Sequence, residues 1–308
     1  MRPFGRPGVA PVVHHSMAND GDTFMKIAFF GTGLMGTGFV RRLLANGNEV
    51  NVWNRSPARA KALEEHGARA FADAAAAVQG VDRIHLSLAD DASVDAVLEP
   101  IAGVIAASTP IVDHTTTAPT PTRERIARWD ARGRVFVHAP VFMAPANAHE
   151  GSGLMLASGE QGRCDALMPA LQAMTGKVVY LGAAPDRAAA FKLFGNLTLI
   201  GLAGVLGDVV RLAQACGVEP ADAMGLFANF NPGQMLPARA AKIASGPYEP
   251  PSFEVAMARK DVRLMIEEAQ RHGFDLAVMP AVAAVYDAAI ARGEGHLDAT
   301  AAMRPRTV

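Results

Sequence analysis

The sequence has little cysteine, few aromatic residues and no excess of charge of either sign. Its two cysteines, Cys164 and Cys216, form no Cys-x-x-Cys pair or Cys/His cluster, which argues against a disulfide framework and a metal site. Lys and Arg number 29 against 30 Asp and Glu, so no basic field is present to recruit nucleic acid or an anionic membrane. These absences favour a protein of the reducing cytoplasm with no nucleic-acid or membrane partner.

Only one long apolar run is present, residues 188–207, and Lys192 is its single charge. Its length would permit a membrane span. Against a span, the run contains four glycines, and a charge at bilayer depth costs at least ~2.5 kcal/mol. We therefore expect a helix buried by protein.

The first 24 residues contain only a short apolar run, residues 9–13, which Pro11 interrupts. That run is too short for the core of a signal peptide. Residues 1–24 are predicted to be a disordered leader, with folded structure beginning near Met25.

A length of 308 residues suggests two domains, and 50% hydrophobic with only 6% aromatic residues predicts cores of small, closely packed side chains. Up to about Gly182, β-branched or apolar runs alternate with alanine-rich stretches, as in a doubly wound parallel sheet covered by helices on both faces. After Pro185 only helical patterns follow. The strand-like runs are KIAFF, EVNVWN, RIHLSLA, PIVDHT, RVFVHA, GLMLAS and KVVYLG, and the helical segments are 187–216, 220–229, 236–244, 253–272 and 279–292.

A glycine-rich turn, GTGLMG at 31–36, follows the first strand directly and precedes a helix and a second strand. In a dinucleotide-binding turn the first glycine permits the bend, the second admits the pyrophosphate and the third packs helix on strand. The phosphates then lie at the positive helix N-terminus. We predict a Rossmann-type cofactor domain over residues 25–185 and an all-helical substrate and dimerisation domain over 186–308, joined by a long helix; an ordinary glycine-rich turn is the alternative. The predicted cofactor contacts here are Gly31, Gly33, Leu34, Met35 and Gly36, with Leu88 after the RIHLSLA strand.

The end of the second strand favours NADP(H) over NAD(H). NAD-binding folds usually place Asp or Glu there for the ribose 2′-hydroxyl, whereas a 2′-phosphate requires a cation and small donors. This chain has Asn54, Arg55 and Ser56, and Arg59 could add a second cation. An arginine can stack on adenine and pair with phosphate; the alternative is that Arg55 is only a solvated surface residue.

Lys192 requires an explanation, because it is the only charge in the apolar run. Its stem could carry the ammonium to water at the helix edge. The alternative is a lysine in the cleft between the domains, where desolvation lowers its pKa and prepares it for proton transfer. Asn196 follows four residues later, on the same helix face.

Four stretches carry a resemblance to a known family. They are GTGLMG at 31–36 with Asn54-Arg55-Ser56, DHTTTAP at 113–119, the pattern GxxxxxxxxxKxxxN from Gly182 to Asn196, and Phe253 followed by Lys260-Asp261. In combination, over residues 25 to about 302, they resemble the β-hydroxyacid dehydrogenases, which include 3-hydroxyisobutyrate dehydrogenases and glyoxylate or succinic semialdehyde reductases. The resemblance also covers the 6-phosphogluconate dehydrogenase type of NAD-binding domain.

The resemblance implies the roles of individual residues. Lys192 would be the catalytic lysine with Asn196 as its partner, and Thr116 would lie near nicotinamide and substrate. From the helical domain, Phe253 and Asp261 would approach the site, with Lys260 near the cofactor. Similar proteins are commonly homodimers or homotetramers that pack the long apolar helix against a partner subunit.

One departure from the family concerns the substrate. Where the family usually has Ser-Gly-Gly to hold a substrate carboxylate, this chain has Phe142, Met143 and Ala144. These three residues are predicted to line an apolar substrate wall, although backbone donors at 144–147 could still hold a carboxylate. The usual Asn-Asn pair after the lysine is Gly195-Asn196.

The sequence as a whole predicts an NADP-dependent oxidoreductase that moves a hydride between nicotinamide and a short semialdehyde or keto acid. Lys192 would act as general acid and base, with Thr116, Asn196 and Asp261 as the other catalytic residues. Two alternatives remain open: an imine reductase-like enzyme, favoured by the apolar wall, and a non-catalytic NADPH-binding protein.

Overall fold

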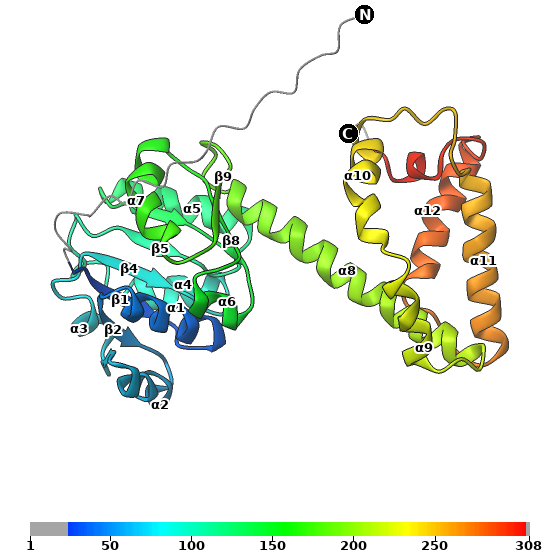
Figure 1. Ribbon diagram of the computed structural model, residues 1–308. Coiled ribbons are helices and arrows are strands. Elements are labelled where there is room, and N and C mark those ends of the chain that lie inside the picture. Colours follow the sequence, from blue (N-terminus) through cyan, green and yellow to red (C-terminus); the bar gives the residue numbers. More distant parts are fainter. Residues whose placement is uncertain (1–23, 306–308) are drawn as a thin grey trace, which may run out of the picture. The chain divides into compact units, whose positions relative to one another are not determined.

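The computed structural model describes residues 24–305, which divide into two compact units, one ending at Leu193 and one beginning at Phe194. Apart from Phe24, the predicted leader lies outside the described residues. The N-terminal unit contains the sheets and the C-terminal unit contains helices (Figure 1).

The main sheet of the N-terminal unit has six parallel strands in the order β3-β2-β1-β4-β5-β6. The strand order reverses between β1 and β4, and ligands of such sheets bind at the carboxyl ends of the strands at this reversal. The predicted Rossmann-type fold is therefore confirmed. The strands are β1 (Lys26–Phe30), β2 (Glu49–Trp53), β3 (Arg69–Ala70), β4 (Arg83–Leu86), β5 (Ile111–Asp113) and β6 (Phe136–His138).

Three further strands form a separate small sheet: β7 (Val141–Phe142), β8 (Leu154–Ala157) and β9 (Lys177–Tyr180). Strand β7 is antiparallel to β8, and β8 is parallel to β9. The expectation that GLMLAS and KVVYLG extend the parallel sheet is therefore wrong. After β6, the edge strand of the main sheet, the chain passes through Ala139 and Pro140 into β7, which pairs with β8 in the small sheet.

Helices cover both faces of the main sheet, as predicted. Alternate residues of β1 enter two cores: Phe29 packs with Phe39 of α1, whereas Phe30 belongs to the core that also contains Trp129 of α5. Because both faces are covered, β1 is a continuous apolar run. The helices of this unit are α1 (Leu34–Ala45), α2 (Pro57–Lys61), α3 (Ala74–Ala77), α4 (Asp91–Leu98), α5 (Pro119–Ala131), α6 (Pro145–Glu150) and α7 (Gln161–Gln172).

The described part of the C-terminal unit is helical apart from one isolated bridge, Glu254 with Asp298, so the all-helical prediction is confirmed. Asp208 on α8 accepts hydrogen bonds from the backbone N–H groups of Ala277, Val278 and Met279 at 2.7, 2.8 and 3.1 Å. It thereby ties α8 to the N-terminus of α12, where a carboxylate is favoured. The helices are α8 (Arg187–Ala215), α9 (Pro220–Gly225), α10 (Leu236–Ser245), α11 (Val255–Arg271) and α12 (Met279–Ala291).

Helix α8 begins in the N-terminal unit and is long and apolar enough to cross a membrane by length and composition alone. Little of its most apolar stretch is buried, and Leu197 and Ile200 are 74% and 72% exposed. The expectation that protein buries this helix therefore stays a prediction.

Candidate functional site

A pocket of about 710 Å³ lies where the strand order reverses, at the carboxyl ends of β1, β2 and β4. It brings together the glycine-rich turn, the segment after β2 and the segment after β4, which are far apart in sequence. All the cofactor contacts predicted for these three segments line it. Its lining residues are Gly31, Gly33, Leu34, Met35, Gly36, Trp53, Asn54, Arg55, Ser56, Arg59, Ser87, Leu88, Ala89, Asp90, Ala92, Ser93, Ala96 and Val97.

The three glycines of the turn have different surroundings. Gly31 has φ +92°, and a Cβ there would lie 2.2 Å from the carbonyl oxygen of Ser87; a Cβ on Gly36 would lie 1.8 Å from the carbonyl oxygen of Gly31. A Cβ on Gly33 would meet nothing within 4 Å, so this glycine faces open space. The turn therefore fits a pyrophosphate in the way the sequence predicts: tight at its two ends and open in the middle.

The N-terminus of α1 opens onto this space. Its N-cap is Gly33, and no side chain caps the helix. The first N–H groups of a helix have no partner within it and, with the helix dipole, attract anions. The residues here thus fit a cofactor phosphate.

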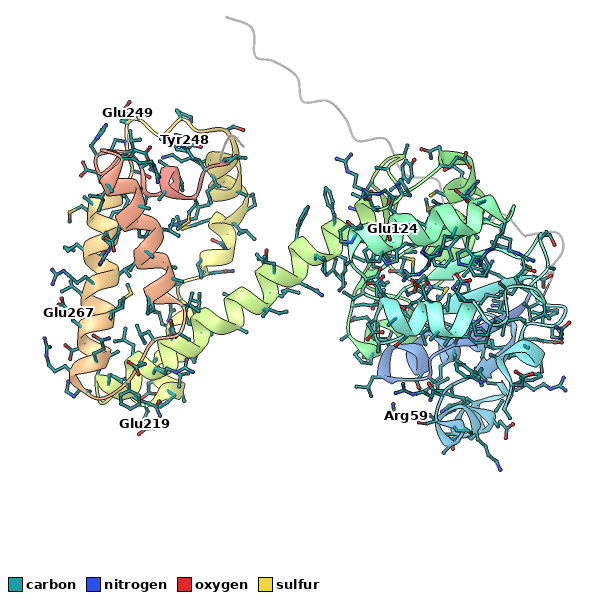
Figure 2. All side chains as sticks on the ribbon, turned by 180° about the vertical axis from the view of Figure 1, so that it is seen from behind. Arg59, Glu124, Glu219, Tyr248, Glu249 and Glu267 are labelled. Atoms are coloured by element: carbon teal, nitrogen blue, oxygen red, sulfur yellow. The ribbon has the colours of Figure 1, made fainter. Side chains whose placement is uncertain are left out.

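The segment after β2 is held in place by Asn54. Its Oδ1 accepts from the N–H of Thr32 at 3.1 Å, and its Nδ2 donates to the carbonyl oxygen of Ser56 at 3.1 Å. Arg55 is exposed and forms no ion pair within the described residues. Arg59, labelled in Figure 2, comes from α2 and also lines a neighbouring pocket of about 680 Å³. Two cations, with no carboxylate at the end of β2, therefore border this part of the pocket.

Sequence reasoning missed the part of the pocket contributed by α4. Asp90, at the entrance to this helix, accepts from the N–H of Ser93 at 2.8 Å and so acts as its N-cap. This hydrogen bond and the positive charge of Arg55 contribute to a lowered pKa of Asp90. An Asp three residues before a Ser, directly after the RIHLSLA strand, is a recognisable helix start and could have located this segment.

Leu88 and Thr116 follow neighbouring strands, β4 and β5. Thr115 joins the two segments: its Oγ1 accepts from the N–H of Leu88 at 3.0 Å, and its N–H donates to Asp113 at 2.9 Å. His138 Nε2 lies 2.8 Å from the carbonyl oxygen of Thr115. Thr115 is thus fixed from three directions and presents the exposed Thr116 at the edge of the sheet.

A chain of buried hydrogen bonds runs beneath this edge. Arg83 Nε donates to His85 Nε2 at 2.7 Å, His85 Nδ1 lies 2.9 Å from His114 Nε2, and His114 Nδ1 lies 2.7 Å from the carbonyl oxygen of Ala139. Because the guanidinium can only donate and the carbonyl can only accept, both imidazoles must be neutral and protonated on Nδ1. Burial lowers both pKa values, that of His114 to about 4.

Lys192 is buried, with only 9% of its surface exposed. Nζ donates to the carbonyl oxygen of Val141 at 2.6 Å and lies 4.2 Å from the centroid of the Phe142 ring. Burial lowers the pKa of the ammonium group. The lysine therefore does not reach water at the helix edge, and the alternative of a solvated lysine is wrong.

The predicted apolar wall begins on β7. Phe142 and Met143 are half-buried, and Ala144 is exposed. The N–H of Ala144 donates to Asn147 Oδ1 at 2.8 Å, and Pro145 has no N–H. Backbone donors for a substrate carboxylate were expected at 144–147. Positions 144 and 145 therefore offer none, because the first N–H is already used and the second does not exist.

Four predicted site residues lie in the C-terminal unit. Asn196 is half-buried on α8, one helical turn after Lys192, and Phe253 is exposed just before α11. Lys260 and Asp261 are neighbours on α11, where Lys260 Nζ lies 2.9 Å from Asp261 Oδ1. The roles of these four residues stay predictions.

Comparison with known proteins matches both parts of the chain. Residues 26–182 match the NAD-binding domain of 6-phosphogluconate dehydrogenase, and residues 187–306 match the NAD-binding domain of NADP-dependent 3-hydroxyisobutyrate dehydrogenase. Glyoxylate/succinic semialdehyde reductase 1 of Arabidopsis thaliana is 26% identical over 283 residues, 90% of this chain and 96% of the relative. The 3-sulfolactaldehyde reductase of Escherichia coli is 27% identical over 277 residues, 88% and 92% of the two chains. Among solved structures, a Streptomyces aurantiacus imine reductase matches with TM-score 0.81 and 25% identity over 90% of this chain and 98% of that one.

Proposed function

Because the chain belongs to the β-hydroxyacid dehydrogenase family of NAD(P)-binding oxidoreductases, we propose that it reduces the carbonyl group of a short semialdehyde or keto acid to a hydroxy acid, using NADPH. The observation that carries the proposal is the buried ammonium of Lys192. A buried lysine without function would be costly, since burial disfavours its charged form.

Lys192 acts as the general acid. A bound nicotinamide would supply the hydride for this reduction. The Lys192 ammonium donates a proton to the carbonyl oxygen of the substrate, and water then protonates the neutral lysine again. Of its three N–H bonds, one is directed to Val141, so others can reach a substrate oxygen. A pKa lowered by burial eases this proton transfer. Thr116, Asn196 and Asp261 orient substrate and lysine.

NADP(H) is the preferred cofactor in this proposal. Arg55 and Arg59 border the pocket beside Ser56, and no carboxylate stands at the end of β2 to accept from a ribose 2′-hydroxyl. Arg55→Ala should weaken NADPH binding about tenfold or more while leaving NADH binding nearly unchanged. Equal losses for both cofactors, measured by fluorescence titration, would contradict the preference.

The protein works as a homodimer or homotetramer in the cytoplasm. The exposed apolar residues of α8, such as Leu197 and Ile200, support a partner subunit there, because large exposed apolar patches mark interaction sites. Both cysteines are free thiols, as expected in a reducing compartment. Light scattering at increasing protein concentration tests the assembly.

Replacement of the lysine is the direct test of the reaction. Lys192→Ala should abolish NADPH oxidation with succinic semialdehyde, glyoxylate and longer aldehydes but leave NADPH binding nearly unchanged. The exposed Lys177 at the start of β9 provides a matched control, and Lys177→Ala should retain full activity. Retained turnover in Lys192→Ala would refute the assignment.

Reduction of imines is the second candidate. The apolar wall at Phe142 and Met143 favours it, as does the likeness to the Streptomyces aurantiacus imine reductase. A cyclic imine assayed beside succinic semialdehyde separates the two reactions. Tight NADPH binding with no turnover of any of these compounds would instead favour a non-catalytic NADPH-binding protein.

A further inference from the structure

The ammonium of Lys192 lies against an aromatic face rather than an anion. Nζ is 4.2 Å from the centroid of the Phe142 ring, and its hydrogen-bond acceptor is a backbone carbonyl, that of Val141. Burial lowers the pKa of this ammonium. Neither neighbour of this ammonium is a carboxylate.

The position of the ring is fixed by the small sheet. Phe142 lies opposite Leu154, and Val141 lies opposite Met155, in the antiparallel pair of β7 and β8. The two residues that contact Nζ are therefore consecutive on one paired strand. The contact is a property of the N-terminal unit, which contains the strand and the first turns of α8.

The electrostatics of the ring favour cations and disfavour anions. The face of a phenyl ring carries the negative part of its quadrupole, so it attracts an ammonium. The same face repels a carboxylate, especially where water is largely excluded. In some substrates a carboxylate is bonded directly to the carbonyl carbon that is reduced. The oxygen of that carbonyl must approach Nζ of Lys192 to receive its proton. Such a carboxylate would be brought close to the ring.

The segment that follows offers an anion little compensation. The N–H of Ala144 is used by Asn147, and Pro145 has none. Met143, which stands between Phe142 and Ala144 in the sequence, has an apolar and half-buried side chain. A carboxylate beside the reacting carbon would thus lose water without gaining these donors.

We propose that Phe142 is a positioning and specificity-determining residue, which holds the Lys192 ammonium by a cation–π contact and excludes substrates whose reacting carbon bears a carboxylate. This inference rests on the proposed carbonyl reduction. The substrates are then aldehydes with an uncharged group on the reacting carbon, and any carboxylate lies further along the chain, as in a semialdehyde.

Substrate choice tests the proposal with two compounds of the same number of non-hydrogen atoms, glyoxylate and methylglyoxal. The native enzyme should prefer methylglyoxal by about tenfold or more in kcat/KM with NADPH, and Phe142→Ser should lower this preference by about tenfold. Equal use of both compounds by the native enzyme, or an unchanged preference in Phe142→Ser, overturns the specificity role.

A titration that needs no turnover tests the positioning role. In protein labelled with ¹³C-lysine, the Cε resonance of Lys192, assigned by its loss in Lys192→Arg, reports the pKa of the ammonium. Phe142→Leu removes the ring and should lower that pKa by about one unit, whereas Phe142→Tyr should retain it. Phe71→Leu is the matched control: it removes a similar ring, which lies 4.9 Å from Arg69, and should leave the Lys192 titration unchanged.

The two experiments separate the inference from the proposed function. If no carbonyl compound is reduced, the proposed function fails, yet the titration still decides whether Phe142 holds the ammonium. An unchanged pKa in Phe142→Leu refutes the cation–π contact. Phe142→Met, a second ring-free variant, replaces the leucine variant if circular dichroism shows that the latter is unfolded.

Discussion

The buried histidines should make the protein unfold more easily in mild acid. In the folded protein burial lowers the pKa of His114 to about 4 from 6.5, and the imidazole is wedged between His85 and the carbonyl oxygen of Ala139. In the unfolded chain it becomes protonated as the pH falls through 6.5. The unfolded state then binds more protons, so stability present above pH 6.5 is lost progressively down to about pH 4.

The size of this loss follows from the shift. At 1.36 kcal/mol per pH unit, His114 alone should cost about 2 kcal/mol of unfolding free energy at pH 5, which lies about 1.5 units below the unfolded pKa. At pH 5 most carboxylates are still ionised, which limits their contribution to the loss. The pKa of His85 is also lowered by burial, so it should add to the loss in the native protein.

Urea unfolding at pH 7.5 and pH 5 measures the effect in the native protein and in His114→Gln. The glutamine cannot titrate, although its amide can still donate and accept hydrogen bonds. The native protein should lose about 2 kcal/mol more than His114→Gln between the two pH values. Equal losses in the two proteins would refute the conclusion that His114 is held neutral.

Three further changes test other parts of the structure. Gly33→Ala should weaken NADPH binding about tenfold or more in fluorescence titration. It should leave the melting temperature of the unliganded protein unchanged, because the Cβ of the new alanine would meet only open space. A lower melting temperature would contradict this account of the turn. Asp208→Asn should lower the unfolding free energy by about 1–2 kcal/mol in urea titration, because the buried carboxylate accepts three backbone N–H groups at the start of α12. An unchanged unfolding free energy would show that this carboxylate contributes little to stability. Arg125→Leu should lower the unfolding free energy by about 3 kcal/mol in the same assay, since the fully buried guanidinium pairs with Asp91 and Asp95. A loss below about 1 kcal/mol would mean that the cost of desolvating the guanidinium offsets these ion pairs.

Local patterns allowed much of the fold and the cofactor pocket to be predicted. KIAFF followed by GTGLMG predicts a strand, a tight turn and a helix. The glycines specify the turn, because only glycine tolerates the φ of Gly31 and the close backbone approach at Gly36. Helices of the C-terminal unit were also predictable, since Pro220 and Gly246 mark helix boundaries by their backbone preferences.

The small sheet and the pocket wall at α4 could not be predicted in the same way. A strand-like run such as GLMLAS specifies an extended chain but not the strands with which it pairs, which are β7 and β9. In the same way, His85, His114 and Ala139 look unrelated in sequence. They meet because β4, β5 and β6 are neighbours in the sheet.

The sequence by itself determined that Lys192 is an isolated charge in an apolar helix and that a phenylalanine stands where similar proteins have a serine. Only the tertiary structure decided that these two side chains touch, with Nζ over the ring of Phe142 and bonded to the carbonyl oxygen of Val141. The physical reason is the separation along the chain. Sequence periodicity orders neighbours within one helix or strand, whereas a contact between residues 50 positions apart depends on how strand β7 and helix α8 pack together.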